Sequence, residues 1–131
     1  MKIETRKKKK KILIIDDERD FTNLLTSALE LHEDYEVGVE NNPGRALATA
    51  RAFAPDIIVL DVVMPEIDGG EVHSRFKADP ALKDIPVIFL TSMVLQNEID
   101  ASQGVIGGAF YVAKPVSASR LISVIGQHLG S

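Results

Sequence analysis

Three runs of four apolar residues constrain the fold of this chain more than any other feature of its sequence. They are ILII at 12–15, IIVL at 57–60 and VIFL at 87–90. None of them alternates apolar with polar residues, and this is the pattern of strands that are buried on both faces, as in a parallel sheet. Two weaker candidates, VGVE at 37–40 and AFYVA at 109–113, complete a set of five predicted strands.

Apolar residues at helical spacing separate these strands. Asn42 and Pro43 are typical of a helix N-cap followed by proline at the first helical position, and Ser117 or Ser119 can cap the last helix. The predicted helices cover residues 21–29, a segment that begins at 42–43, residues 71–78, residues 94–103 and a segment that follows 117–119. Strict alternation of strands and helices predicts a doubly wound α/β fold, with a five-stranded parallel sheet and five helices on its two faces.

The length and composition fit one domain with a substantial hydrophobic core, since the chain has 131 residues of which 45% are hydrophobic. It contains no cysteine, which excludes disulfide scaffolds, thiolate metal sites and cysteine nucleophiles. No apolar run approaches the roughly 20 residues that span a bilayer. The N-terminus also lacks the apolar stretch of a secretory signal. We therefore expect a cytoplasmic protein.

Charge is divided unevenly along the chain. Residues 1–11 carry seven Lys or Arg against one acid, whereas the remaining residues carry eight against eighteen. We expect residues 1–10 to form a basic tail and residues 11–131 to form the folded domain. A solvated tail is the simplest interpretation, and weak attraction to nucleic acid or an anionic membrane is the alternative. The acidic body itself is a poor nucleic-acid binder.

Polar residues follow the central predicted strands, where ligand sites of doubly wound sheets lie. Asp16 and Asp17 follow the first strand, Asp61 the third, Thr91 the fourth and Lys114 the fifth. One lysine cannot neutralise three aspartates, whereas Mg²⁺ prefers carboxylate oxygens as ligands. A cation beside a lysine and a hydroxyl group can hold a phosphoryl group, and Asp carboxylates act as nucleophiles toward phosphorus.

Four motifs, taken in their order, resemble the receiver domain of bacterial two-component response regulators. They are IIDDE at 14–18, D-x-x-M-P-x-x-D-G at 61–69, the Thr91–Ser92 pair and Y-x-x-K-P at 111–115. The resemblance covers residues 11–129 and implies a flavodoxin-like sheet with the strand order 2-1-3-4-5. It also implies a signalling domain rather than an enzyme, with a histidine kinase or phosphotransfer protein and a downstream protein as its partners.

The resemblance implies a cation site. Asp16 and Asp17 would bind Mg²⁺, with Asp17 the more direct ligand and Asp16 acting partly through water. Asp61 would supply another carboxylate oxygen, and Val63 a backbone carbonyl. Glu18, in contrast, is expected in the first turn of the first helix, where acids are favoured by the helix dipole.

The resemblance also implies a phosphorylation reaction and a switch. Asp61 would accept the phosphoryl group, Lys114 would neutralise its charge, and Thr91 would turn its hydroxyl toward it. Tyr111 would follow the movement of Thr91. Together these changes would alter the surface that the fourth predicted helix, fifth predicted strand and fifth predicted helix form.

Other functions stay open on the sequence alone. A hydrolase of the haloacid dehalogenase type also uses an aspartate at a strand end, but it needs a second acid where this chain has Val63. A receiver-like scaffold that binds proteins without being phosphorylated is a further alternative. Asp16 and Asp17 could also act simply as a helix cap, and Tyr111 as a core residue. Because the sequence stops at Ser131, we expect either a stand-alone receiver or a piece of a longer regulator.

Overall fold

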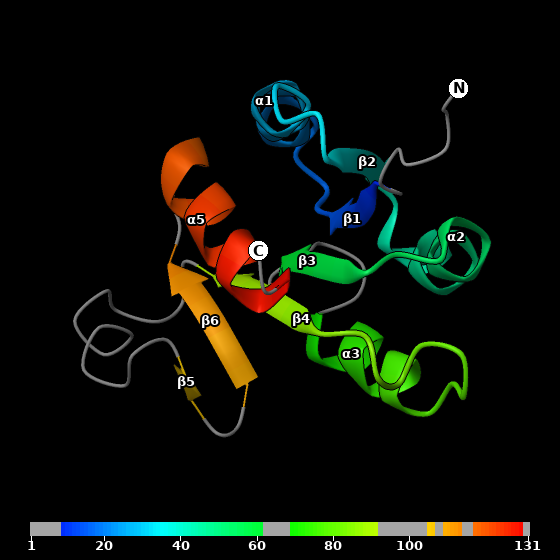
Figure 1. Cartoon of the computed structure of the whole chain (residues 1–131). Helices are drawn as coiled ribbons and strands as arrows, with labels where there is room; N and C mark the ends of the chain where they lie inside the picture. The colour runs from blue at the N-terminus through cyan, green and yellow to red at the C-terminus, as the bar shows by residue number, and fades with distance from the viewer. Residues whose placement is uncertain (1–8, 62–68, 92–104, 107–108, 114–116, 130–131) are drawn as a thin grey trace.

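A computed structural model describes residues 9–61, 69–91, 105–106, 109–113 and 117–129 of the chain (Figure 1). Its helices are α1 (Arg19–Leu29), α2 (Ala46–Phe53), α3 (Gly69–Lys77) and α5 (Ala118–Leu129), with a short 3₁₀ helix η1 (Pro43–Arg45). Its strands are β1 (Lys10–Ile15), β2 (Tyr35–Glu40), β3 (Ile57–Asp61), β4 (Val87–Thr91), β5 (Val105–Ile106) and β6 (Ala109–Ala113). The helix predicted at 94–103 lies outside the described residues.

The strands form one sheet in the order β2-β1-β3-β4-β6-β5. β2, β1, β3, β4 and β6 are the five predicted strands, and each pair of neighbours among them is parallel. The predicted order 2-1-3-4-5 is therefore confirmed. β5 was not predicted, because two residues are too few to give a periodic signal. It pairs antiparallel with β6 at the edge of the sheet.

Helices cover both faces of the sheet, with α1 and α5 on one side and α2 and α3 on the other (Figure 1). The strands supply side chains to both faces in alternation: Ile12 and Ile14 of β1 belong to the core under α1 and α5, and Leu13 and Ile15 to the core under α2 and α3. All four are completely buried. Burial on both faces is the physical reason that these strands read as unbroken apolar runs.

The helix caps agree in part with the prediction. The Asn42 side chain accepts a hydrogen bond from the Gly44 N–H at 3.0 Å, but the α-helix begins only at Ala46, because η1 takes up the first turn. At the last helix, Ser117 is the capping serine, since its Oγ accepts a hydrogen bond from the Arg120 N–H at 3.1 Å.

A buried aspartate holds the loop between α3 and β4. Asp79 is 6% exposed and accepts hydrogen bonds from the Ala81 N–H at 2.8 Å and from Arg51 Nε at 2.6 Å. The Ala81 N–H is the main reason that the pKa of Asp79 lies below 3.8, and Arg51 adds to this effect against the opposing effect of burial.

We expect this carboxylate to make the free energy of unfolding depend on pH in the acid range. Because the pKa of Asp79 is lower in the folded protein, its contribution is present above pH 3.8 and is lost as the pH falls through the folded value. Urea unfolding at a series of pH values from neutral downward should therefore show that the free energy of unfolding falls less steeply with pH for Asp79→Asn than for the wild type. Asp84→Asn, at an exposed position nearby, is the matched control and should keep the wild-type slope; equal slopes for all three proteins would contradict the assignment.

Candidate functional site

The register of the strands brings predicted site residues together at the carboxyl edge of the sheet. Ile15 of β1 lies opposite Leu60 of β3, so the next residue of each chain segment, Asp16 and Asp61, lies at the same level. Both aspartates are buried, with exposures of 0% and 4%. Burial of two neighbouring carboxylates is costly unless a partner offsets their charge.

A third carboxylate joins them. Oxygen atoms of Asp16, Glu18 and Asp61 all lie within 4.8 Å of one another. Three carboxylates at this spacing offer the hard oxygen ligands that Mg²⁺ prefers, and a divalent cation would offset the charge that the three groups concentrate. Among the residues that the structure describes, this cluster does not include Asp17, which is half-buried beside it.

The position of Glu18 corrects the prediction that placed it in the first turn of a helix. Glu18 is the N-cap residue of α1, with extended backbone angles (φ −87°, ψ 102°). A turn at residues 16–18 brings the Glu18 carboxylate beside that of Asp16. The spacing Asp16-x-Glu18 was the signal in the sequence that could have identified it.

Hydrogen bonds fix the turn that carries these acids. The Asp16 N–H donates to the Glu40 carbonyl at 3.2 Å, which extends the β1–β2 pairing by one residue. The Glu18 N–H donates to Asp16 Oδ1 at 3.0 Å. A third bond comes from a residue that the sequence analysis did not identify: Asn41 Nδ2 donates to the Asp16 carbonyl at 2.7 Å.

Thr91 and Tyr111 lie on the strands next to β3. Leu90 pairs with Asp61 and Thr91 pairs with Ala113, so the backbone of Thr91 extends one residue beyond the level of Asp61. The half-buried ring of Tyr111 stacks on Phe89, with centroids 5.0 Å apart. Val63 and Lys114 lie outside the described residues, as does Met93.

His73 of α3 continues this aromatic contact. Its ring meets Phe89 edge-on at a centroid distance of 4.9 Å. Burial lowers the pKa of His73, and the nearby Lys77 lowers it further, which favours the neutral ring in this packed position. The three rings connect α3, β4 and β6 on the face of the sheet that α2 and α3 cover.

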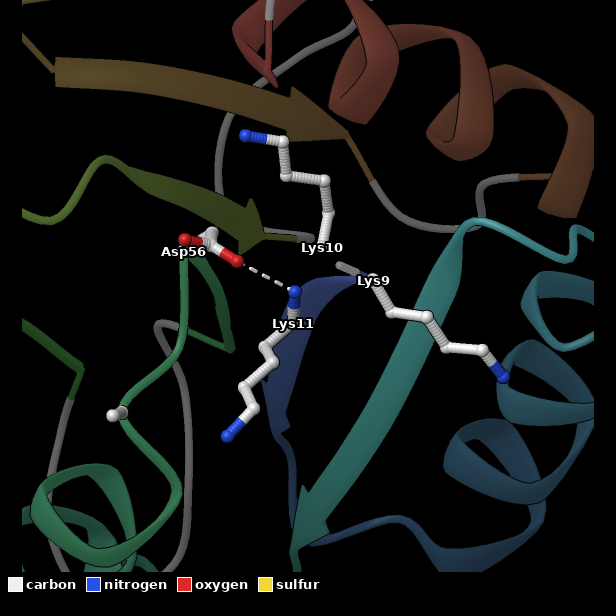
Figure 2. Close-up of a pocket in the computed structure, with 5 residues that line it drawn as sticks. Lys9, Lys10, Lys11 and Asp56 are labelled. Carbon is white, nitrogen blue, oxygen red and sulfur yellow. Dashed lines mark hydrogen bonds between the residues drawn. The ribbon is translucent and has the colours of Figure 1, made fainter. Parts of the chain in front are cut away.

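A cavity of about 180 Å³ lies at the opposite, amino end of β1. Figure 2 shows its lining by Lys9, Lys10, Lys11 and Asp56, with the Asp56 carboxylate accepting a hydrogen bond from the Lys11 N–H at 2.7 Å. The Lys11 ammonium donates to the Phe53 carbonyl at 3.1 Å. This cavity is therefore separated from the carboxylate cluster by the length of the strand.

Comparison with known proteins gives consistent matches. The family model described as the response regulator receiver domain matches residues 12–126. The polar-differentiation response regulator DivK of Brucella anthropi is 34% identical over 122 residues, which cover 92% of this chain and 97% of that protein.

Within the described residues, the structure contains no helix with both the length and the apolar character of a membrane span.

Two further matches differ in how much of the other protein they cover. The crystal structure of the signal receiver domain of a DNA-binding response regulator from Colwellia psychrerythraea 34H has a TM-score of 0.76 and 28% identity, and the match covers 93% of this chain and 99% of that one. A probable cyclic di-GMP phosphodiesterase of Vibrio cholerae is 37% identical over 90% of this chain, but the match spans only 26% of that protein.

Proposed function

Because the chain belongs to the response regulator receiver domain family, we propose that it accepts a phosphoryl group on Asp61 from the phosphohistidine of a histidine kinase or phosphotransfer protein. Domains of this family are signalling domains. The observation that carries the proposal is the cluster of Asp16, Glu18 and Asp61 at the carboxyl edge of the sheet. In this proposal Asp61 is the nucleophile, and the two further acids beside it bind a cation.

The cation site in this proposal has carboxylate and carbonyl oxygens as ligands. Asp16 and Asp61 would hold Mg²⁺ with Asp17 and the Val63 carbonyl, and Glu18 is a further carboxylate at the same place. When bound, Mg²⁺ offsets negative charge on the phosphoryl oxygens. The chemistry of the donor set supports this choice, because all the side-chain donors are hard oxygen atoms.

The transfer reaction needs an in-line approach of Asp61. One carboxylate oxygen of Asp61 forms a bond to phosphorus while the bond between phosphorus and the donor imidazole nitrogen breaks. The imidazole keeps the electron pair and takes up a proton. Lys114 binds the phosphoryl oxygens through its ammonium group, and the Thr91 hydroxyl donates a hydrogen bond to them.

The switch in this proposal follows the movement of Thr91. Tyr111 takes up the space that Thr91 leaves, and the surface predicted for the fourth helix, fifth strand and fifth helix changes to favour a downstream protein. The chain acts in the cytoplasm in this proposal. The basic tail, predicted at residues 1–10, ends before Lys10, because Lys10 begins β1, and it attracts nucleic acid only weakly.

The direct test is incubation of the wild-type protein with a small phosphodonor and Mg²⁺, followed by intact mass measurement. We expect the mass to rise by one phosphoryl group, and the gain to disappear when a chelator replaces Mg²⁺. A protein that gains no phosphoryl group from small donors or from phosphohistidine proteins would refute the proposal.

The phosphorylated form should lose its phosphoryl group slowly. The positions two after Asp61 and two after Thr91 hold Val63 and Met93, and neither side chain can orient an attacking water by hydrogen bonding. We expect the variant Val63→Asn, Met93→Glu to shorten the half-life of the aspartyl phosphate by about tenfold. Following the decay of the phosphorylated mass checks this, and an unchanged half-life would remove the idea.

A further inference from the structure

The turn between β1 and α1 is tied to the end of β2 by one side chain. Asn41 follows directly after β2, and its Nδ2 donates hydrogen bonds to the Asp16 carbonyl at 2.7 Å and to Thr22 Oγ1 at 3.1 Å. Its Oδ1 accepts a longer hydrogen bond from Arg19 Nη1 at 3.4 Å. A single amide group thus contacts the first acid of the cluster and two residues of α1.

The partners of Asn41 are themselves fixed. Thr22 is completely buried, and its hydroxyl donates to the Arg19 carbonyl at 3.0 Å while it accepts from Asn41. The Thr22 N–H donates to the Glu18 carbonyl at 3.0 Å, which is the first turn of α1. The amide of Asn41 therefore lies within a network that includes the backbone on both sides of the acidic turn.

We propose that Asn41 is a positioning residue for the divalent cation site, holding the Asp16–Glu18 turn so that its carboxylates stay close to Asp61. The inference rests on the proposed function only in that this cluster binds a cation. Mutual repulsion of the three carboxylates pushes the turn away from β3. The hydrogen bond to the Asp16 carbonyl opposes that movement at the residue that carries the first carboxylate.

Asn41 touches neither the cation nor the phosphoryl group in this proposal. Its effect is to prepare the ligand geometry before binding, as outer contacts of metal ligands do in other proteins, where their loss weakens metal affinity by about 10- to 100-fold. The neighbouring Asn42 is of the same type but caps η1 through Gly44. The chain therefore contains a matched control at the next position.

The experiment measures Mn²⁺ binding to the unphosphorylated full chain by electron paramagnetic resonance, with Mg²⁺ as competitor. Asn41→Asp keeps the shape of the side chain but replaces the donor group by a carboxylate oxygen. A positioning role predicts about tenfold weaker Mn²⁺ binding. An added negative charge near the site, acting alone, would instead strengthen binding. The sign of the change therefore separates the two effects.

Two further variants complete the test. Asn42→Ala should lower the thermal unfolding temperature but leave Mn²⁺ affinity unchanged. Thr22→Val removes the hydroxyl that accepts a hydrogen bond from Asn41 and donates one to the Arg19 carbonyl. This variant should weaken Mn²⁺ binding about threefold. It also keeps the proposal testable if Asn41→Asp fails to fold, because a Thr22→Val protein that binds Mn²⁺ as tightly as the wild type would overturn it.

Three other outcomes would also overturn the inference. They are a wild-type protein that does not bind Mn²⁺, an Asn41→Asp protein that binds it as tightly as the wild type, and an Asn42→Ala protein that loses as much affinity as Asn41→Asp. Failure of the proposed function looks different. In that case the wild type binds Mn²⁺ and the Asn41 variant binds it more weakly, yet neither gains a phosphoryl group.

Discussion

Replacing Asp61 by asparagine is expected to abolish phosphorylation and, in the absence of divalent cations, to raise the free energy of unfolding. The first effect follows because an amide oxygen does not act as the nucleophile toward phosphorus. The second follows from the cluster, in which oxygen atoms of Asp16, Glu18 and Asp61 lie within 4.8 Å of one another. The repulsion energy of two like charges about 4 Å apart is about 1–4 kcal/mol at effective dielectric constants between those of water and a protein surface.

Two measurements test this prediction. Intact mass after treatment with a small phosphodonor should show no phosphorylated Asp61→Asn protein. Urea unfolding in a chelator should show a gain of about 1–2 kcal/mol, and added Mg²⁺ should stabilise the variant less than it stabilises the wild type. Retained phosphorylation would mean that another residue is the acceptor.

Asp56→Asn is the matched control for this variant. Asp56 is exposed and directly precedes β3, whereas Asp61 ends that strand. The control protein should be phosphorylated as fully as the wild type. Its stability should fall slightly, because an amide oxygen accepts the hydrogen bond from the Lys11 N–H more weakly than the Asp56 carboxylate does.

Replacing Phe76 by alanine is expected to give the largest loss of stability among substitutions away from the cluster. Phe76 lies on α3, is 1% exposed, and packs in the core between the sheet and the helices α2 and α3. Truncating a buried phenylalanine leaves a cavity that the surroundings fill only in part, at a cost of about 3–5 kcal/mol. A domain of this size has about 5–15 kcal/mol of stability in total.

Urea unfolding measures the effect of Phe76→Ala directly. Leu24→Ala on α1 is the control, because Leu24 is 67% exposed and its truncation should change stability by at most about 0.5 kcal/mol. A loss below about 1 kcal/mol for Phe76→Ala would show that α3 does not pack as described.

The parts of the fold that could be predicted were those with a strong local signal. The runs at 12–15 and 57–60 are apolar because both faces of β1 and β3 are covered, and parallel order follows from alternation with helices. The sequence patterns failed to predict the structure where the backbone departs from the regular periods of α-helices and β-strands. Pro43 begins a 3₁₀ turn instead of α2, since both helix types accept proline at their first position.

The site could be predicted where the strand ends determine it. Asp16 and Asp61 meet because adjacent parallel strands end at one edge. Glu18 was misplaced, because acids at a helix start are common for electrostatic reasons alone. Pro43 identified Asn42 as the cap, but no pattern in the sequence indicates that the amide of Asn41 reaches the turn between β1 and α1. The position of Asp16 beside Asp61 is confirmed, whereas the roles of all the predicted site residues stay predictions: Asp16, Asp17, Asp61, Val63, Thr91, Lys114 and Tyr111.

The hydrogen bonds between Lys11 and Asp56 at the amino end of β1 have a consequence for folding specificity. Because Ile12, Leu13, Ile14 and Ile15 are apolar on both faces, burial alone gives β1 no preference for one alignment over another. The backbone bond from Asp56 to Lys11 and the carboxylate bond back to the Lys11 N–H select the native alignment against β3. A slip of one residue would move Asp16 by about 3.3 Å along the strand. A polar contact at the amino end of β1 thus fixes the alignment of β1 against β3 and, with it, the distance between Asp16 and Asp61.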